Sequence, residues 1–273
     1  MNAGRAFRHL SMLILAAIWI VPLYLVLINS ATDPADYRTK EVYELPPSFA
    51  FWDNVEFAWN GARLGVSVGS TLFYASAGGL LAVFFAGLAA FAIVTLRIRH
   101  GFFWFLVLYA GTIFPFQMYL SPLYSQYVRF DLYDTRFGLL LFYTAIAIPF
   151  AVFVLRNHFS GIPYELPEAA RIDGASPWRI FGQIYSPLSI NAFATVFILQ
   201  FTWIWNDLLF GLTLSRSAEV RPIMTALASL QGQYSSASVP VVLAGALIVS
   251  IPTFILFFAV QRVFVRGLGA TTR

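Results

Sequence analysis

The segment HFSGIPYELPEAARIDGASPWRIFGQIYSPLSIN, residues 158–191, is a polar interruption between long apolar stretches. Pro167 stands where a helix can begin, because proline is tolerated in a first helical turn. Asp173-Gly174 ends that helix, and Ser176-Pro177 provides an N-cap and a first-turn proline for a second one. Pro187 ends the second helix. The segment therefore predicts two short helices around a glycine bend, an arrangement that suits docking of a soluble partner.

The stretches on either side of this segment have the composition of membrane-spanning helices. The chain is 59% hydrophobic and 11% charged, whereas a soluble domain carries roughly 25% charged residues. A helix needs about 20 apolar residues to cross about 30 Å of hydrocarbon. Stretches near this length lie at 10–29, 65–96, 102–126, 137–155, 190–214 and 239–260. We therefore predict an all-α, polytopic membrane protein with six transmembrane helices, in contact with membrane lipid.

The spans divide the chain into three parts. Residues 1–64 hold the first transmembrane helix and an extended outer loop, 65–268 a core that includes the polar helices at 158–189, and 269–273 a short tail. The first stretch follows Arg5 and Arg8 as in a signal peptide, but its apolar run exceeds the roughly 7–15 residues of such peptides. We therefore expect it to be retained.

An even number of spans places both termini on one side of the membrane. Basic residues beside spans favour the cytoplasmic side. With both termini inside, Arg97, Arg99 and Arg156 flank spans on that side. The termini and the polar segment are therefore predicted to be cytoplasmic.

Small residues are frequent in the second stretch, and Gly65 and Gly69 have small-xxx-small spacing. Such residues let helix backbones approach closely in a membrane. This pattern favours a helix packed tightly at a seam between helices.

The polar segment also resembles a known motif. The positions that carry the likeness are Glu168-Ala169-Ala170, Asp173-Gly174-Ala175, Phe181, Ile184 and Pro187-Leu188. They resemble the EAA motif of binding-protein-dependent ABC importer permeases, whose cytoplasmic coupling helix inserts into a cleft of a separate ATP-hydrolysing subunit. The family pattern usually ends on a second proline, where this chain has Asn191. The resemblance implies that coupling to the ATPase involves Glu168, Ala169, Ala170, Asp173, Gly174, Ala175, Phe181 and Pro187.

Further motifs are similar to the maltose-type, carbohydrate-uptake branch of that family. They are Asp134-Thr135, Phe137-Gly138-Leu139, Trp205-Asn206-Asp207, Gln261-Arg262 and Gly267-Leu268. The resemblance implies a type I ABC importer permease in a bacterial cytoplasmic (inner) membrane, with a sugar or sugar-like cargo. It also implies a second homologous permease chain, an ATPase dimer that binds ATP and Mg, and an external solute-binding protein as partners. No cofactor is expected in this chain.

The energy source must lie in a partner if this is an importer of that kind. The only lysine is Lys40, so the chain has no P-loop, which needs a lysine after a glycine-rich loop. HExxH and GxSxG motifs and metal-ligand clusters are also missing from the sequence, which argues against an enzyme. Scattered basic residues argue against nucleic-acid binding.

Two alternatives remain. An ion-coupled secondary transporter keeps ionisable residues at mid-membrane, and the only candidate, Asp207, is expected near the outer interface as a polar group rather than a cargo contact. An ABC permease for a non-sugar solute is the other alternative.

Sugars stack on aromatic rings and hydrogen-bond to polar groups. Candidates for the substrate path are Gln117, Tyr119, Tyr143, Trp203, Trp205 and Asn206. The outer loop at 32–63, with Trp52 and Trp59, either receives the binding protein or serves as a cap.

Overall fold

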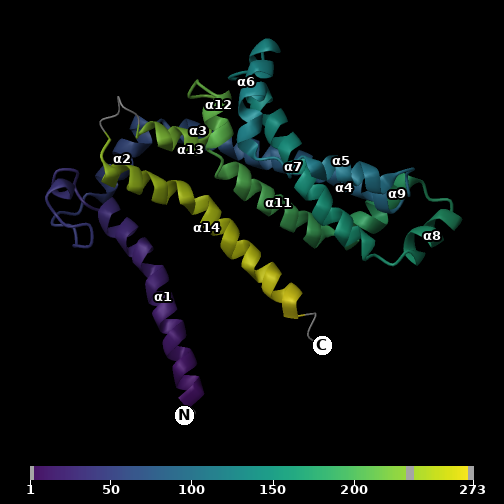
Figure 1. The fold of residues 1–273 in the computed structure, drawn as a ribbon, viewed down its shortest axis with the longest axis horizontal. Coiled ribbons are helices and arrows are strands. Elements are labelled where there is room, and N and C mark those ends of the chain that lie inside the picture. The colour runs from purple at the N-terminus through teal and green to yellow at the C-terminus, as the bar shows by residue number, and fades with distance from the viewer. Residues whose placement is uncertain (1–2, 232–236, 270–273) are drawn as a thin grey trace. The chain divides into compact units, whose positions relative to one another are not determined.

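The computed structural model describes residues 3–231 and 237–269, and for 259–269 it describes the backbone alone. The elements within these ranges are helices, besides one isolated antiparallel bridge between Thr32 and Phe49, so the all-α prediction is confirmed (Figure 1). Apart from Gly269, the predicted tail at 269–273 lies outside the described residues.

The α-helices follow one another along the chain. They are α1 (Ala3–Ser30), α2 (Phe51–Gly61), α3 (Leu64–Phe73), α4 (Gly79–Val94), α5 (Gly101–Ala110), α6 (Leu120–Arg129), α7 (Arg136–Ser160), α8 (Glu165–Ile172), α9 (Pro177–Ile180), α10 (Ser186–Leu188), α11 (Ile190–Trp205), α12 (Leu209–Leu214), α13 (Ile223–Ser229) and α14 (Val239–Gly269). The 3₁₀ helices are η1 (Asp36–Arg38) and η3 (Phe116–Tyr119), and the π-helical turns are η2 (Tyr74–Gly78) and η4 (Phe181–Tyr185).

Four helices in the described part of the chain are long and apolar enough to cross a membrane. They are Phe7–Ser30, Leu64–Val94, Arg136–Ser160 and Val239–Phe258. They match the first, second, fourth and sixth predicted spans. The second runs through α3, η2 and α4 without a break, because its backbone groups stay hydrogen-bonded through the π-helical turn.

The third and fifth predicted spans are not single helices. The stretch 102–126 leaves the helix after Ala110 and resumes at η3, because Pro115 adopts an extended ψ of 131° and lacks the donor that a helix needs. The stretch 190–214 stops at Trp205 and restarts in α12. On the other side of α11, the segment Pro177–Leu188 meets Ile190–Trp205 at a bend of 78°. Within the described residues, four predicted spans are therefore single long helices, and the third and fifth are interrupted.

The residues group into two compact units, each described by itself. The first contains Met1–Gly65 and Ala226–Ile251, and the second contains Val66–Thr225 and Pro252–Arg273. In the first unit, the predicted outer loop is held to the end of α1 by the buried Asn54. Its Nδ2 donates to the carbonyl oxygens of Ser30 and Thr32, at 3.0 and 2.9 Å.

The second unit is built around α4 and α7, with α5 and α11 packed against them. Glycines make this packing close: a Cβ added at Gly79 would lie 3.2 Å from the Phe197 ring of α11, and one at Gly87 would lie 3.0 Å from Phe193. The predicted close packing of small residues between helices is therefore present at Gly79 and Gly87. At Gly69 an added Cβ would meet no atom within 4 Å.

A buried core fills the space between these helices in the second unit. Its members include Ala86 and Phe91 of α4, Leu155 and Phe159 of α7, and Val196 of α11. The chain enters α7 from α6 and leaves it towards α8 and α9, so these two regions lie at opposite ends of α7 (Figure 1).

Candidate functional site

The polar segment at 158–191 forms the helices that its punctuation predicts, with two differences in their ends. Gly174 has a φ of +79°, in the left-handed region that glycine adopts without strain. Ser176 caps α9, because its Oγ accepts a hydrogen bond from the Arg179 N–H at 3.3 Å. However, α8 begins at Glu165, so Pro167 is its third residue, which a first turn tolerates because those N–H groups lack helical partners. The second helix continues past Pro187 to Leu188.

One face of this segment packs against the core of the second unit. Pro167 is buried, and Ala170, Ala175 and Phe181 are half-buried. The Phe181 ring lies 5.4 Å from the ring of Phe91 on α4. Aromatic edge contacts of this kind give the packing a defined geometry.

The other face is exposed and carries the remaining predicted coupling residues. They are Glu168, Ala169, Asp173, Gly174 and Pro187. Two large apolar side chains that sequence reasoning missed stand among them: Ile172 is 87% exposed and Trp178 is 69% exposed. Exposed apolar side chains grouped with polar ones are typical of a protein-binding surface. Ile172 and Trp178 could have been found from their place in the polar segment.

Arg171 ties α8 to the C-terminal end of α4. Its Nη2 donates to the Thr95 carbonyl oxygen, which follows α4 directly, and its Nη1 donates to the Tyr164 hydroxyl at 3.1 Å. The guanidinium of Arg97 lies 4.2 Å from the centre of the Tyr164 ring, a cation–π distance. These contacts attach α8 to the end of α4. Sequence reasoning missed this link, because the partners are 76 residues apart.

The predicted path residues lie in three kinds of place: at or next to a cavity, in the buried core, and on the surface. Trp203 lines a cavity. Gln117 and Tyr119 lie in η3, which also contains the cavity residue Phe116. The Tyr119 hydroxyl donates to the Gly111 carbonyl oxygen at 3.1 Å. Tyr143 and Trp205 are buried. Asn206 is exposed, and its Nδ2 donates to the carbonyl oxygen of Thr202 at 2.7 Å.

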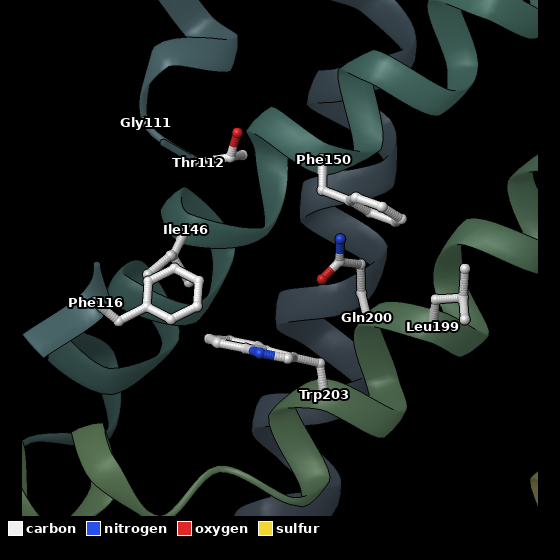
Figure 2. A pocket seen from close by; sticks show the side chains of 8 residues that line it. All are labelled: Gly111, Thr112, Phe116, Ile146, Phe150, Leu199, Gln200 and Trp203. Carbon is white, nitrogen blue, oxygen red and sulfur yellow. The ribbon is translucent and has the colours of Figure 1, made fainter. Parts of the chain in front are cut away.

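The cavity has a volume of about 310 Å³ and lies within the second unit. Three segments form its walls: the break after α5, α7 and α11. The lining residues are Gly111, Thr112, Phe116, Ile146, Phe150, Leu199, Gln200 and Trp203 (Figure 2). Only Trp203 among them was predicted, because the others become neighbours only when the helices pack.

Asp207 is buried and has a structural role. Its Oδ2 accepts hydrogen bonds from the Tyr143 hydroxyl at 2.8 Å and from the Gly211 N–H at 3.0 Å. Its Oδ1 accepts the Phe210 N–H at 3.4 Å. The carboxylate thus caps the first turn of α12 and explains why the fifth predicted span breaks there.

Asp134 performs a similar role outside the membrane-spanning helices. Its Oδ1 accepts hydrogen bonds from the Arg216 N–H at 2.8 Å, the Ser217 N–H at 2.9 Å and the Ser217 hydroxyl at 3.0 Å. Partial burial acts to raise the pKa of Asp134, but these hydrogen bonds outweigh it and hold the pKa below its ordinary value. The two motifs that contain Asp134 and Asp207 therefore fasten the turns of the second unit.

Comparisons with known proteins agree with this architecture. Residues 1–269 match the family described as "Binding-protein-dependent transport system inner membrane component". A probable ABC transporter permease protein of Pyrococcus horikoshii is 41% identical over 157 residues, which cover 58% of this chain and 57% of that protein. The melibiose/raffinose/stachyose import permease protein MelC of Bacillus subtilis is 31% identical over 258 residues, which cover 94% of this chain and 92% of MelC.

A solved structure has the same fold. It is the crystal structure of a bacterial ABC transporter involved in the import of the acidic polysaccharide alginate, and one of its chains superposes with a TM-score of 0.74 at 25% identity. The match covers 96% of this chain and 98% of that chain. The chain described here therefore belongs to the family of inner-membrane components of binding-protein-dependent transport systems, as a permease subunit of an ABC importer.

Proposed function

We propose that this chain moves a sugar or sugar-like polar solute across a bacterial cytoplasmic membrane by alternating access, driven by ATP hydrolysis in a separate subunit. Its termini and the segment 158–189 face the cytoplasm. Its partners are a second homologous permease chain, an ATPase dimer that holds ATP and Mg, and an external solute-binding protein. The chain itself is not catalytic.

One observation carries the coupling role: the segment 158–189 is anchored on one face and exposed on the other. Arg171 and Phe181 fix it to the end of α4 and to the core. Ile172 and Trp178 stand out from it. A partner that grips these side chains and moves would therefore pull on α4, a helix of the membrane-spanning core.

The lysine in this chain serves the outer loop. The Lys40 Nζ donates to the Asn29 Oδ1 at 3.1 Å and to the carbonyl oxygens of Glu41 and Glu44. It therefore supports the fold of the loop, and a partner must provide the phosphate-binding lysine.

A sugar cargo is supported by the names of relatives. MelC is named for the import of melibiose, raffinose and stachyose, and the solved transporter for alginate. The aromatic and amide side chains of the cavity also suit a sugar. A non-sugar polar solute remains the alternative cargo.

The test is uptake by the complete transporter in proteoliposomes, with its binding protein present. Melibiose, maltose and D-glucose are offered with ATP inside and no ion gradient, and then with a proton or sodium gradient and no ATP. We expect uptake of a sugar with ATP alone. Uptake that follows an ion gradient and ignores ATP would contradict the proposal, and ATP-driven uptake of other polar solutes but of no sugar would favour the alternative cargo.

A further inference from the structure

The cavity between α7 and α11 lies at the middle of the membrane-spanning helices. Ile146 and Phe150, which line it, stand on either side of the midpoint of α7, a 25-residue span. Gly111 and Thr112 are at the centre of the apolar stretch 102–126. The positions of these residues along α7 and along the stretch 102–126 both place the cavity in the hydrocarbon layer.

The backbone beside the cavity is not helical. Between α5 and η3 the chain runs through turns, in which the Thr112 N–H donates to the Tyr109 carbonyl oxygen at 2.9 Å. Irregular backbone at membrane depth is tolerated only where protein covers it or where it lines a polar cavity. Gly111 and Thr112 are both exposed and line this cavity. The broken helix therefore points to an occupant with hydrogen-bonding groups.

The Gln200 amide is a second polar group in the cavity wall. Its side chain is 5% exposed, and its Nε2 donates to the Ala147 carbonyl oxygen of α7 at 3.1 Å. Within residues 3–231 and 237–269, the bond to Ala147 is the one hydrogen bond of this amide. The amide oxygen and the second N–H can therefore bind a ligand. Figure 2 shows the amide between Phe150 and Trp203.

The remaining walls are aromatic planes. The rings of Phe116 and Trp203 lie 5.9 Å apart at an angle of 57°, so they form two walls of a corner. A sugar ring has an apolar face that stacks on such planes and a rim of hydroxyls that suits an amide. The volume of about 310 Å³ is at the lower end of ligand sites, roughly 300–1,000 Å³, which fits a small part of a cargo at a time.

We propose that this cavity is a transit subsite for a sugar ring, with Trp203 as the stacking plane and Gln200 as the hydrogen-bonding group. The inference rests on the proposed function and extends it, because it assigns cargo contact to this chain. A lipid acyl chain also fits an apolar cavity, but it would give no hydrogen-bond partner to the oxygen and the second N–H of the Gln200 amide, which costs free energy.

The chain contains no cysteine, so Thr112→Cys creates a single reporter in the cavity. Ser125→Cys on α6 is a matched control, because Ser125 is also exposed but does not line the cavity. The complete transporter in nanodiscs is treated with a water-soluble maleimide, with and without melibiose, maltose or D-glucose. We expect the transported sugar to slow labelling in T112C and to leave labelling in S125C unchanged.

A second variant tests the stacking plane. Adding Trp203→Ala to T112C should raise the sugar concentration that halves the labelling rate by about tenfold, and Trp203→Phe should raise it less.

Two results would overturn the subsite while leaving the proposed function intact. One is a sugar that is taken up with ATP but gives T112C no protection. The other is a T112C cavity that reacts only with a lipid-soluble maleimide, as expected for an acyl chain. Failure of ATP-driven uptake of every sugar would instead remove the proposed function.

Discussion

Gly174 is the residue that allows the chain to turn between α8 and α9. Its φ of +79° is one that other residues adopt only under strain, and a Cβ added there would meet no atom within 4 Å. A substitution at this position therefore acts through backbone conformation and not through collision. The expected strain is about 1–3 kcal/mol, enough to change the population of the docking geometry about fivefold or more.

We expect Gly174→Val to leave assembly and ATP hydrolysis in place and to reduce sugar uptake about fivefold or more. Gly174→Asn should have a milder effect, because asparagine tolerates the left-handed region. Gly182→Ala is the control, since Gly182 is exposed and has no positive φ. The measurement is sugar uptake per ATP hydrolysed in proteoliposomes. Normal coupling in Gly174→Val would contradict the role of the Gly174 bend in coupling.

Asp134 gives the fold a dependence on acid. Its pKa is lower in the folded chain than its ordinary value of about 3.9, so its stabilising contribution is fully present above that value. The contribution is lost as the pH falls through the folded pKa. Asp134→Asn should lower the Tm at pH 7 and should show a smaller further loss between about pH 4 and pH 2 than the wild type. Thermal unfolding in detergent over this range measures both, and parallel curves for the two proteins would refute the role.

At the scale of elements, the attachment of α8 to α4 should carry the coupling signal. Arg171→Gln removes the guanidinium that reaches the Thr95 carbonyl oxygen. We expect ATP hydrolysis to lose most of its stimulation by sugar-loaded binding protein, while the ATPase still co-purifies. Arg179→Gln is the matched control, because the Arg179 Nε donates to Gln183 on the same segment, at 3.0 Å. Equal effects of the two variants would exclude a specific link through Arg171.

Local signals in the sequence predict some elements well. Apolar runs of sufficient length identify four spans, and the bend at Gly174 follows from residues next to one another in the chain. The breaks near Gly111 and Asp207 were missed, although Pro115 gives a signal for the first. The second depends on the Asp207 carboxylate capping α12 and accepting the Tyr143 hydroxyl, 64 residues away in sequence.

The candidate sites follow the same rule. The helix ends and the glycine bend of the segment 158–189 are predictable from adjacent residues, but the exposure of Ile172 and Trp178 was not predicted. The cavity is not predictable in this way, because Thr112, Ile146 and Gln200 come from three separate segments. Hydropathy treats Gln200 as one polar residue in an apolar run and does not show that its amide bridges α11 to Ala147 on α7.

At the scale of the whole molecule, we propose that energy enters through a partner subunit and that the cargo passes through this chain at a separate place. The chain has the proposed coupling surface at the α8 end of α7 and, near the middle of α7, a cavity with aromatic and amide walls. The central claim is that Ile172 and Trp178 lie in the cytoplasm against the ATPase.

The most direct test uses Ile172→Cys, a single cysteine in this chain at the most exposed large apolar side chain of the segment. In inverted membrane vesicles containing the complete transporter, we expect this cysteine to react with a membrane-impermeant maleimide and to cross-link to the ATPase through a short bifunctional reagent. Trp52→Cys in the outer loop should instead react from the external face in right-side-out vesicles. Labelling of Ile172→Cys from outside, or its failure to cross-link to any ATPase chain, would contradict the account.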